Sequence, residues 1–374
     1  MKRWFLLILT LFFACTPNPA EKAQEVVIGV FGSMTGTTAT FGQSTRKGVE
    51  MATAELNAKG GLLGKKIRLV IEDDQGKPEE AQTVATKLVN KDRVVAMIGE
   101  TASSRSLAAA PVCQQAGIPM VSPSSTNPKV TQAGDYIFRV CFIDPFQGQA
   151  MARFAAETLK LKKVAILRDI KNDYSVGLAD VFANNFKKLG GDIVSDQSYG
   201  EGDTDFSAQL TSIHSSSPEA VFVPGYYTEV GLIARQARKL GITVPLLGGD
   251  GWESPKLWEI GGEAINGCFY TNHYSLNDPN PSIQNFVKAY RSQFQETPDA
   301  VGALSYDAMR ILAAAITKAG TTDGPRIRQA LASTKDFAGV TGNITLDANR
   351  NAVKPAVVLR IQDGKLEFVQ RVNP

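Results

Sequence analysis

Most of the side chains in this chain that could do chemistry lie in five short segments, and each segment follows an apolar run. They are residues 99–104, 122–126, 168–174, 225–227 and 248–252. Together they hold serine and threonine hydroxyls, a predicted helix N-terminus, several tyrosines and the carboxylate of Asp250. Hydroxyls and helix N-termini bind carboxylates, whereas a carboxylate binds an ammonium group. This set of groups therefore suits a zwitterionic amino acid better than a covalent reaction.

The five segments do not hold the groups that catalysis or metal binding requires. The two histidines, His214 and His273, lie far from every loop serine in the sequence, which argues against a Ser–His–Asp hydrolase. The glycines from Gly29 to Gly42 miss the spacing of a dinucleotide fingerprint, and no Ser or Thr follows the lysines of segment 60–66, as a phosphate-binding loop needs. Isolated cysteines offer no metal spacing. We therefore expect no enzyme activity, cofactor or metal.

Each candidate residue also has an ordinary structural interpretation, which the sequence leaves open. Ser103 could be a simple helix cap, and Ser124 and Thr126 could form a turn before a proline. Tyr174 could be partly packed in a core, as could Tyr226. Asp250, between two glycines, could be a turn or capping residue, because a buried carboxylate needs compensating partners.

Short apolar runs alternate with helical periodicity along nearly the whole chain of 374 residues. Strands are expected at 26–30, 67–71, 94–98 and 118–121, and again at 164–167, 193–194, 220–223 and 244–247. A Gly-rich loop is expected through Gly42, and helices after Pro281, followed by two β-like segments at the C-terminus. Repeated strand–helix units predict parallel sheets with helices on both faces. Two such series predict an α/β fold of two doubly wound, Rossmann-like lobes.

The N-terminus is typical of a targeting segment. Lys2 and Arg3 precede a short apolar stretch that ends at Ala14, too short to span a bilayer. Cys15 follows directly, so residues 1–15 are predicted to be a lipoprotein signal peptide and 16–25 a tether, with plain secretion as the alternative. Cys113, Cys141 and Cys268 are expected to be small buried side chains, with one disulfide as the alternative. A net charge of +3 without a basic run indicates no nucleic-acid partner.

Three stretches carry a resemblance to a known family: 57–66 with Asp73 and Asp74, 203–207, and 235–238. With them the chain resembles the branched-chain amino-acid binding proteins, which have the type I periplasmic binding fold and feed ABC importers. The resemblance covers residues 26–374. It implies a hinge of three crossings, with 26–145 and 274–352 in lobe I and 146–273 and 353–374 in lobe II. The strand–helix pattern alone divides the chain once, near residue 145.

The resemblance also implies roles for single residues. The ligand's carboxylate and ammonium would be bound by Ser103 and Thr126, and its ammonium also by the Ser124 carbonyl and Asp250. Tyr174 and Tyr226 would close over the ligand from lobe II. The predicted ligand-binding set is Phe41, Ala102, Ser103, Ser124, Thr126, Tyr174, Tyr226, Asp250 and Trp252. Leucine-binding members typically have Glu at the position of Asp250 and Tyr at that of Phe41. Trp252 is expected to fill the space that the shorter acid leaves.

The sequence therefore predicts an extracytoplasmic solute-binding protein that captures a branched-chain or other neutral amino acid. Its expected partners are that amino acid and an ABC permease of the inner membrane. We expect a monomer, periplasmic or at the cell surface, that is tethered to the membrane by a lipid on Cys15. The alternative is a ligand-sensing subunit of a signalling or chemotaxis system. A repressor with this fold would need an N-terminal helix-turn-helix, where this chain has a signal segment.

Overall fold

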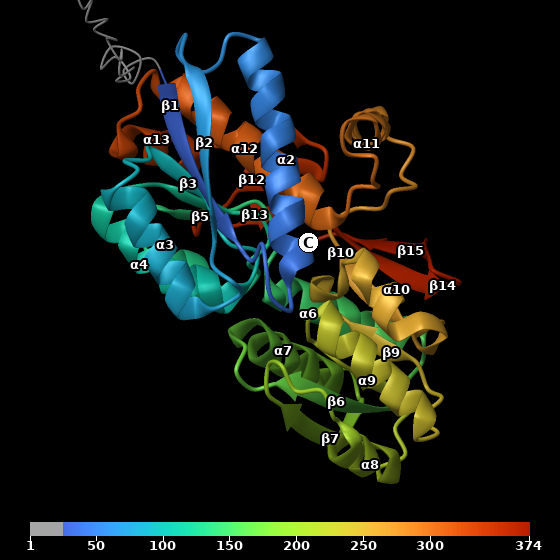
Figure 1. Cartoon of the computed structure of the whole chain (residues 1–374). Coiled ribbons are helices and arrows are strands. Elements are labelled where there is room, and N and C mark those ends of the chain that lie inside the picture. Colours follow the sequence, from blue (N-terminus) through green and yellow to red (C-terminus); the bar gives the residue numbers. More distant parts are fainter. Residues whose placement is uncertain (1–24) are drawn as a thin grey trace, which may run out of the picture.

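The structure is a computed structural model that describes residues 25–374, so the predicted signal peptide and Cys15 lie outside the described residues. The described part forms two lobes, one above the other in Figure 1. We call lobe I the part around a five-stranded sheet of order β2-β1-β3-β4-β5, and lobe II the part around a seven-stranded sheet of order β15-β14-β10-β9-β8-β6-β7. The C-terminus lies between the lobes.

All strand pairs of the lobe I sheet are parallel. Its N-terminal elements are β1 (Glu25–Gly32), α2 (Ala39–Ala58), β2 (Lys66–Asp73), α3 (Pro78–Asn90), β3 (Ala96–Ile98), α4 (Ser103–Ala116), β4 (Met120–Ser122), α5 (Lys129–Gln132) and β5 (Ile137–Arg139). The chain later returns to add α11 (Pro281–Phe294), α12 (Ala300–Ala319), α13 (Gly324–Ala332) and a small antiparallel sheet of β11 (Phe337–Gly339), β12 (Gly342–Leu346) and β13 (Ala352–Val353).

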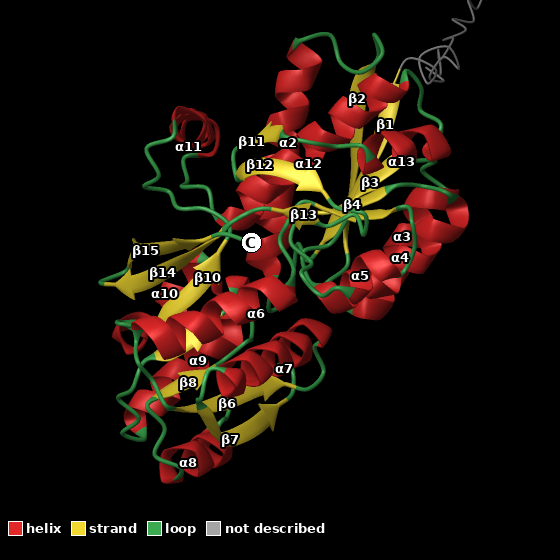
Figure 2. Cartoon of the chain, turned by 180° about the vertical axis from the view of Figure 1, so that it is seen from behind, coloured by secondary structure: helices red, strands yellow, loops and turns green. Residues whose placement is uncertain are grey.

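Alternation along β1 explains why helices cover both faces of this sheet. Val26, Ile28 and Val30 belong to one buried cluster with residues of α2 and α12, whereas Phe31 belongs to another with residues of α3 and α4. Successive strand side chains point to opposite faces, so a strand that is apolar at nearly every position needs cover on both sides. Figure 2 shows the strands enclosed by helices in this way.

Helix α12 is the centre of lobe I. Within residues 25–374 it is the one helix that is long and apolar enough to span a membrane, and 83% of its apolar window is buried inside the protein. It lies against α2 so closely that a Cβ on Gly48 would stand 2.2 Å from the carbonyl oxygen of Gly302. The apolar character of α12 is therefore that of a core helix.

Lobe II repeats the pattern with its own strands and helices. Its elements are α6 (Asp144–Arg153), a short π-helix (Phe154–Thr158), β6 (Lys163–Asp169), α7 (Asp173–Lys188), β7 (Asp192–Tyr199), α8 (Ser207–Ser215), β8 (Ala220–Phe222), α9 (Tyr227–Lys239), β9 (Leu246–Gly248), a 3₁₀ turn (Asp250–Trp252), α10 (Pro255–Gly261), a second 3₁₀ turn (Gly262–Ile265), β10 (Phe269–Asn272), β14 (Ala356–Gln362) and β15 (Lys365–Val372). Strands β6 to β10 pair in parallel, and β14 joins β10 antiparallel.

The predicted α/β architecture of two doubly wound lobes is confirmed, with local differences. The loop predicted through Gly42 is wrong, because α2 begins at Ala39 and takes in that glycine. Strand β5, strand β10 and the β11–β13 sheet were not expected. The chain passes between the lobes around residues 140–144, 273–281 and 353–356. We propose to divide the chain into its lobes after residues 145, 273 and 352.

Candidate functional site

The loops that leave the carboxyl ends of β3 and β4 in lobe I meet the loops after β6, β8 and β9 in lobe II. Ligands of open parallel sheets bind at these strand ends. A small cavity lies between the lobes here. It is lined by Phe41, Thr101, Ser103, Ser124 and Val301 from lobe I and by Tyr174, Tyr226, Asp250 and Gly251 from lobe II. Six of the nine predicted ligand-binding residues therefore come together around one cavity.

One end of the cavity is suited to a carboxylate. Ala102, not Ser103, occupies the N-cap of α4, and no side chain caps this helix end, so the simple capping interpretation of Ser103 does not hold. The Ser103 hydroxyl oxygen accepts a hydrogen bond from the Asn127 backbone N–H at 3.1 Å. Its own proton remains available to donate, beside the positive end of a 14-residue helix.

The other end of the cavity is suited to an ammonium group. Oδ1 of Asp250 accepts a hydrogen bond from Gln147 Nε2 at 3.0 Å. Oδ2 lies 2.9 Å from His273 Nε2 and 3.4 Å from the Ser124 hydroxyl, which donates to it from lobe I. Asp250 is 7% exposed, and within residues 25–374 no backbone N–H donates to its carboxylate, so it is neither a helix cap nor a turn-stabilising group. Burial lowers the pKa of His273, although Asp250 opposes this, so the imidazole is neutral at pH 7.

Aromatic rings form a further part of the cavity wall. The rings of Tyr174 and Tyr226 are stacked, with centroids 5.4 Å apart and planes at 4°. Phe41 reaches from lobe I and meets Tyr226 edge-on at 5.4 Å and Tyr227 at 5.2 Å. The Tyr174 hydroxyl accepts a hydrogen bond from the Gly251 N–H at 3.0 Å. Burial raises the pKa of Tyr174 well above its usual range, so the wall is uncharged.

Three predicted residues lie outside the lining. Ala102 is buried at the N-cap of α4. Thr126 is buried, its carbonyl accepts from Asp144 N–H at 3.0 Å, and its hydroxyl has no partner in the described part of the chain. The expectation that Trp252 fills space beside Asp250 is corrected. Its indole N–H donates to the Val223 carbonyl at 2.9 Å and its ring packs against Gly248, because Trp252 turns into the core of lobe II.

Sequence reasoning missed several residues of the site. Thr101 and Gly251 lie within the loops that the sequence identified, so their neighbours gave the signal. Val301 comes from α12, and no local pattern distinguishes it from a core residue. His273 follows β10, a strand that the sequence analysis did not predict, and therefore its position at a strand end was not visible.

Polar contacts hold the lobes together outside the cavity. The buried Arg105 of α4 forms an ion pair at 3.0 Å with Glu201, which follows β7 in lobe II. The Ser104 hydroxyl donates to the Asp173 carboxylate at 3.0 Å and accepts from the Asp173 N–H at 2.9 Å. The structure therefore has its lobes closed on each other.

Comparison with known proteins assigns the family. A family model described as periplasmic binding protein matches residues 25–365. The chain belongs to the periplasmic binding protein family. A curated relative from Brucella melitensis, Leu/Ile/Val-binding protein homolog 3, is 32% identical over 364 residues, which cover 96% of this chain and 98% of that protein.

Two solved periplasmic binding proteins have similar structures. The leucine-binding protein LivK of Thermotoga maritima is 42% identical with a TM-score of 0.89, covering 93% of this chain and 99% of that one. LivJ of Streptococcus pneumoniae, solved in complex with isoleucine, is 36% identical with a TM-score of 0.89, covering 94% and 100%. These similarities extend through both lobes, so the predicted type I periplasmic binding fold is confirmed.

Possible metal ligands and three cysteines of this periplasmic binding protein lie in the described part of the chain. Between residues 25 and 374 no three His, Cys, Asp or Glu side chains lie together as metal ligands. Cys113, Cys141 and Cys268 are unpaired and buried, as expected. Burial raises the pKa of Cys113 and of Cys141 to about 12, which keeps both thiols protonated and unreactive.

Proposed function

We propose that this protein captures one neutral amino acid between its lobes and delivers it to an ABC importer. The observation that carries the proposal is the polarity of the cavity. The N-terminus of α4 with the Ser103 hydroxyl and the Asp250 carboxylate, held by uncharged donors, line the same cavity. An α-carboxylate and an α-ammonium would each meet a complementary group.

The remaining lining favours an uncharged side chain. Phe41, Tyr226 and Val301 offer apolar surface, and Asp250 is the only charged residue of the lining. An acidic side chain would have no cation to pair with there, and a basic one would compete with the α-ammonium for a single carboxylate. A branched-chain or similar neutral amino acid meets these conditions.

The named relatives support transport over sensing. The Brucella protein is named for leucine, isoleucine and valine, and the Thermotoga protein for leucine. The Streptococcus protein is described as a branched-chain amino acid transporter substrate-binding protein. None of these three is named as part of a signalling system. A ligand-sensing subunit, the alternative from the sequence, therefore has no support among them.

We also propose that the protein is not an enzyme and that it works outside the cytoplasm. No histidine lines the cavity beside Ser103 or Ser124, since His273 lies behind Asp250 and its proton is directed to that carboxylate. We further propose an extracytoplasmic monomer whose Cys15 carries a lipid that tethers it beside an inner-membrane permease. Mass spectrometry of the exported protein tests the lipid, and an intact N-terminus from Met1 to Ala14 would contradict it.

A thermal-shift screen of the twenty amino acids, followed by calorimetric titration, tests the ligand class. At 100 times its dissociation constant, the ligand stabilises the folded state by about 2.7 kcal/mol, a clearly measurable shift. We expect neutral aliphatic amino acids to give the largest shifts and Asp, Glu, Lys and Arg none. The matched control is the 2-keto acid with the same side chain, which has no ammonium group and should bind weakly. Equal shifts with the keto acid, or none with any amino acid, would refute the proposal.

A further inference from the structure

Of the three side-chain donors to Asp250, the two from lobe II belong to different elements. His273 follows β10 and Gln147 lies on α6, while Asp250 follows β9, the parallel neighbour of β10. Gln147 Nε2 donates to both Asp250 and Asp144, and Gln147 Oε1 accepts from the Thr271 hydroxyl at 3.0 Å. Both polar atoms of the Gln147 amide therefore have hydrogen-bond partners. These hydrogen bonds fix the orientation of the Gln147 side chain, and Gln147 in turn fixes the position of Oδ1 of Asp250.

His273 is fixed just as firmly, from the side of the hinge. Its ring stacks on Phe142 with centroids 3.8 Å apart and planes at 20°, and Phe142 lies in the first crossing between the lobes. A carboxylate oxygen only accepts, so Nε2 carries the proton in the 2.9 Å contact with Asp250. His273 is 3% exposed and does not line the cavity, so it acts on a ligand only through Asp250.

The charge of these donors matters more than their number. Two neutral donors orient the Asp250 carboxylate and leave its full negative charge for a ligand. An imidazolium in the same place would cancel that charge and repel an ammonium across the carboxylate. We propose that His273 is the positioning residue of the ammonium site, and that its protonation in acid weakens amino-acid binding. This inference rests on the proposed function.

The direction of the pH dependence follows from linkage. Below the pKa of His273 the unliganded protein holds one proton more than the complex, and binding must release it. The affinity therefore falls as the pH decreases, by up to tenfold per pH unit for one proton, and levels off at higher pH. Burial lowers the pKa of His273 below the ordinary value of about 6.5, so this fall lies in acid, below about pH 6.5.

Other titratable groups face this site and must be separated from His273. Lys354 and Cys141 approach it from the other crossings, but burial lowers the pKa of Lys354 only to about 8 and raises that of Cys141 to about 12, both above the window. Asp144 contacts Asp250 through Gln147, and burial with the Asp250 charge raises its pKa to about 7. Protonation of Asp144 would also reduce the negative charge at the site, so its own variant is needed.

The experiment is calorimetric titration at pH 5, 6 and 7 with the amino acid that stabilises the wild type most. His273→Gln retains an N–H donor that cannot titrate, so we expect affinity within about threefold of the wild type at pH 7 and little change down to pH 5. His273→Phe retains the stacking but loses the donor, so affinity should fall tenfold or more at pH 7. Asp144→Asn should still show the fall in acid.

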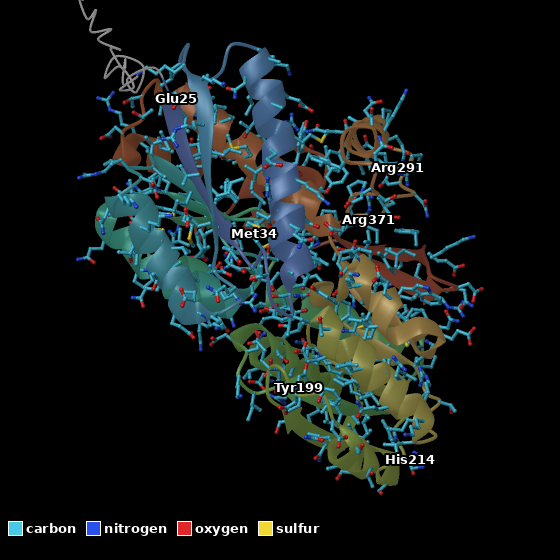
Figure 3. All side chains as sticks on the ribbon, in the orientation of Figure 1. Glu25, Met34, Tyr199, His214, Arg291 and Arg371 are labelled. Carbon is cyan, nitrogen blue, oxygen red and sulfur yellow. The ribbon has the colours of Figure 1, made fainter. Side chains whose placement is uncertain are left out.

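The chain offers a matched control, because it has only one other histidine. His214 lies in the last turn of α8 and is exposed; it is at the bottom of Figure 3. His214→Gln should reproduce the wild-type profile. A fall that persists in His273→Gln, or that vanishes in Asp144→Asn, would overturn the inference, as would wild-type affinity in His273→Phe. A wild type that binds no amino acid at pH 7 refutes the proposed function as well, so the two failures are distinguishable.

Discussion

Asp250 meets side-chain donors from three elements, and none of these donors is a lysine or arginine. Most buried carboxylates in proteins are paired with a cation, because an isolated charge is costly to remove from water. Here hydrogen bonds from Gln147, His273 and Ser124 supply part of the compensation. At the residue scale this arrangement holds a negative charge ready for a cationic ligand group.

Asp250→Asn tests that charge directly. The substitution retains shape and one acceptor but removes the charge, so affinity should fall by about thirtyfold or more, the effect of about 2–5 kcal/mol for breaking a buried charge pair. The unliganded melting temperature should change little, because the amide can still bond Gln147. Titration with the amino acid and with its 2-keto acid makes the comparison. An equal loss for both ligands would show that the charge acts on protein structure and not on the ammonium.

Ser103→Ala tests the other end of the cavity. The hydroxyl proton is free to donate, so its loss should weaken binding by about 1.5–3 kcal/mol if it bonds a carboxylate. Binding should survive, because the N-terminus of α4 remains. Ser104→Ala is a poor control since Ser104 bonds Asp173 across the lobes, whereas Ser207→Ala on α8 is a suitable one. Calorimetric titration of both variants with the amino acid measures the effect. Equal affinities in Ser103→Ala and Ser207→Ala would show that the Ser103 hydroxyl does not bind the ligand.

Single residues of the site could be predicted from the sequence where they directly follow a predicted strand. Ser103, Tyr226 and Asp250 all follow predicted strands, and all line the cavity. His273 could not be predicted, because its strand is short and its role depends on β9 and β10 being neighbours. Trp252 was misplaced for a related reason: the sequence shows which residue is adjacent to Asp250 but not which way its side chain turns.

At the scale of elements, long periodic segments were predictable and close packing was not. The helix that starts at Ser103 lies where the sequence indicated, after the loop that follows an apolar strand. The contact of α2 with α12 had no such sign in the sequence. The two helices lie nearly backbone to backbone at Gly48.

Gly48→Ala tests this contact. The new methyl group would stand 2.2 Å from the Gly302 carbonyl oxygen, so the two helices must separate. We expect unfolding to become easier by about 1–3 kcal/mol, the usual cost of overpacking. The control is Gly60→Ala, where a Cβ has open space but the backbone φ is +100°, so only backbone strain is added. Urea unfolding of both variants measures the difference, and a Gly48→Ala protein as stable as the wild type would contradict the close packing.

At the scale of the whole molecule, closure depends on contacts that neither lobe can make alone. The Arg105–Glu201 ion pair joins α4 of lobe I to lobe II, with Glu201 29% exposed and Arg105 only 3%. Such a pair exists only while the lobes touch. It should therefore contribute to ligand affinity without contacting the ligand, because binding and closure are one equilibrium.

Glu201→Gln should weaken amino-acid binding by about threefold to tenfold, the equivalent of roughly 0.7–1.4 kcal/mol. Small-angle scattering should show a smaller radius of gyration on adding ligand to the wild type. The variant should reach the same liganded radius at a higher ligand concentration. Glu50→Gln, which breaks an ion pair within α2, is the matched control and should bind normally. The same affinity loss in both variants, or a radius that ligand does not change, would count against closure.

Phe41 and Val301 belong to lobe I in the fold, yet both are buried in the hydrophobic cluster of lobe II together with Ala102. Parting the lobes would return these side chains to water, so ligand-driven closure buries apolar surface of the protein as well as of the ligand. The heat capacity change of binding should therefore include a contribution from the protein. About 200 Å² for the Phe41 ring, at roughly 0.45 cal/mol/K per Å², gives about −0.1 kcal/mol/K from that ring alone. Titrations at several temperatures should become steadily more exothermic, and less steeply so in Phe41→Ala. An identical slope in that variant would mean that Phe41 stays covered when the lobes part.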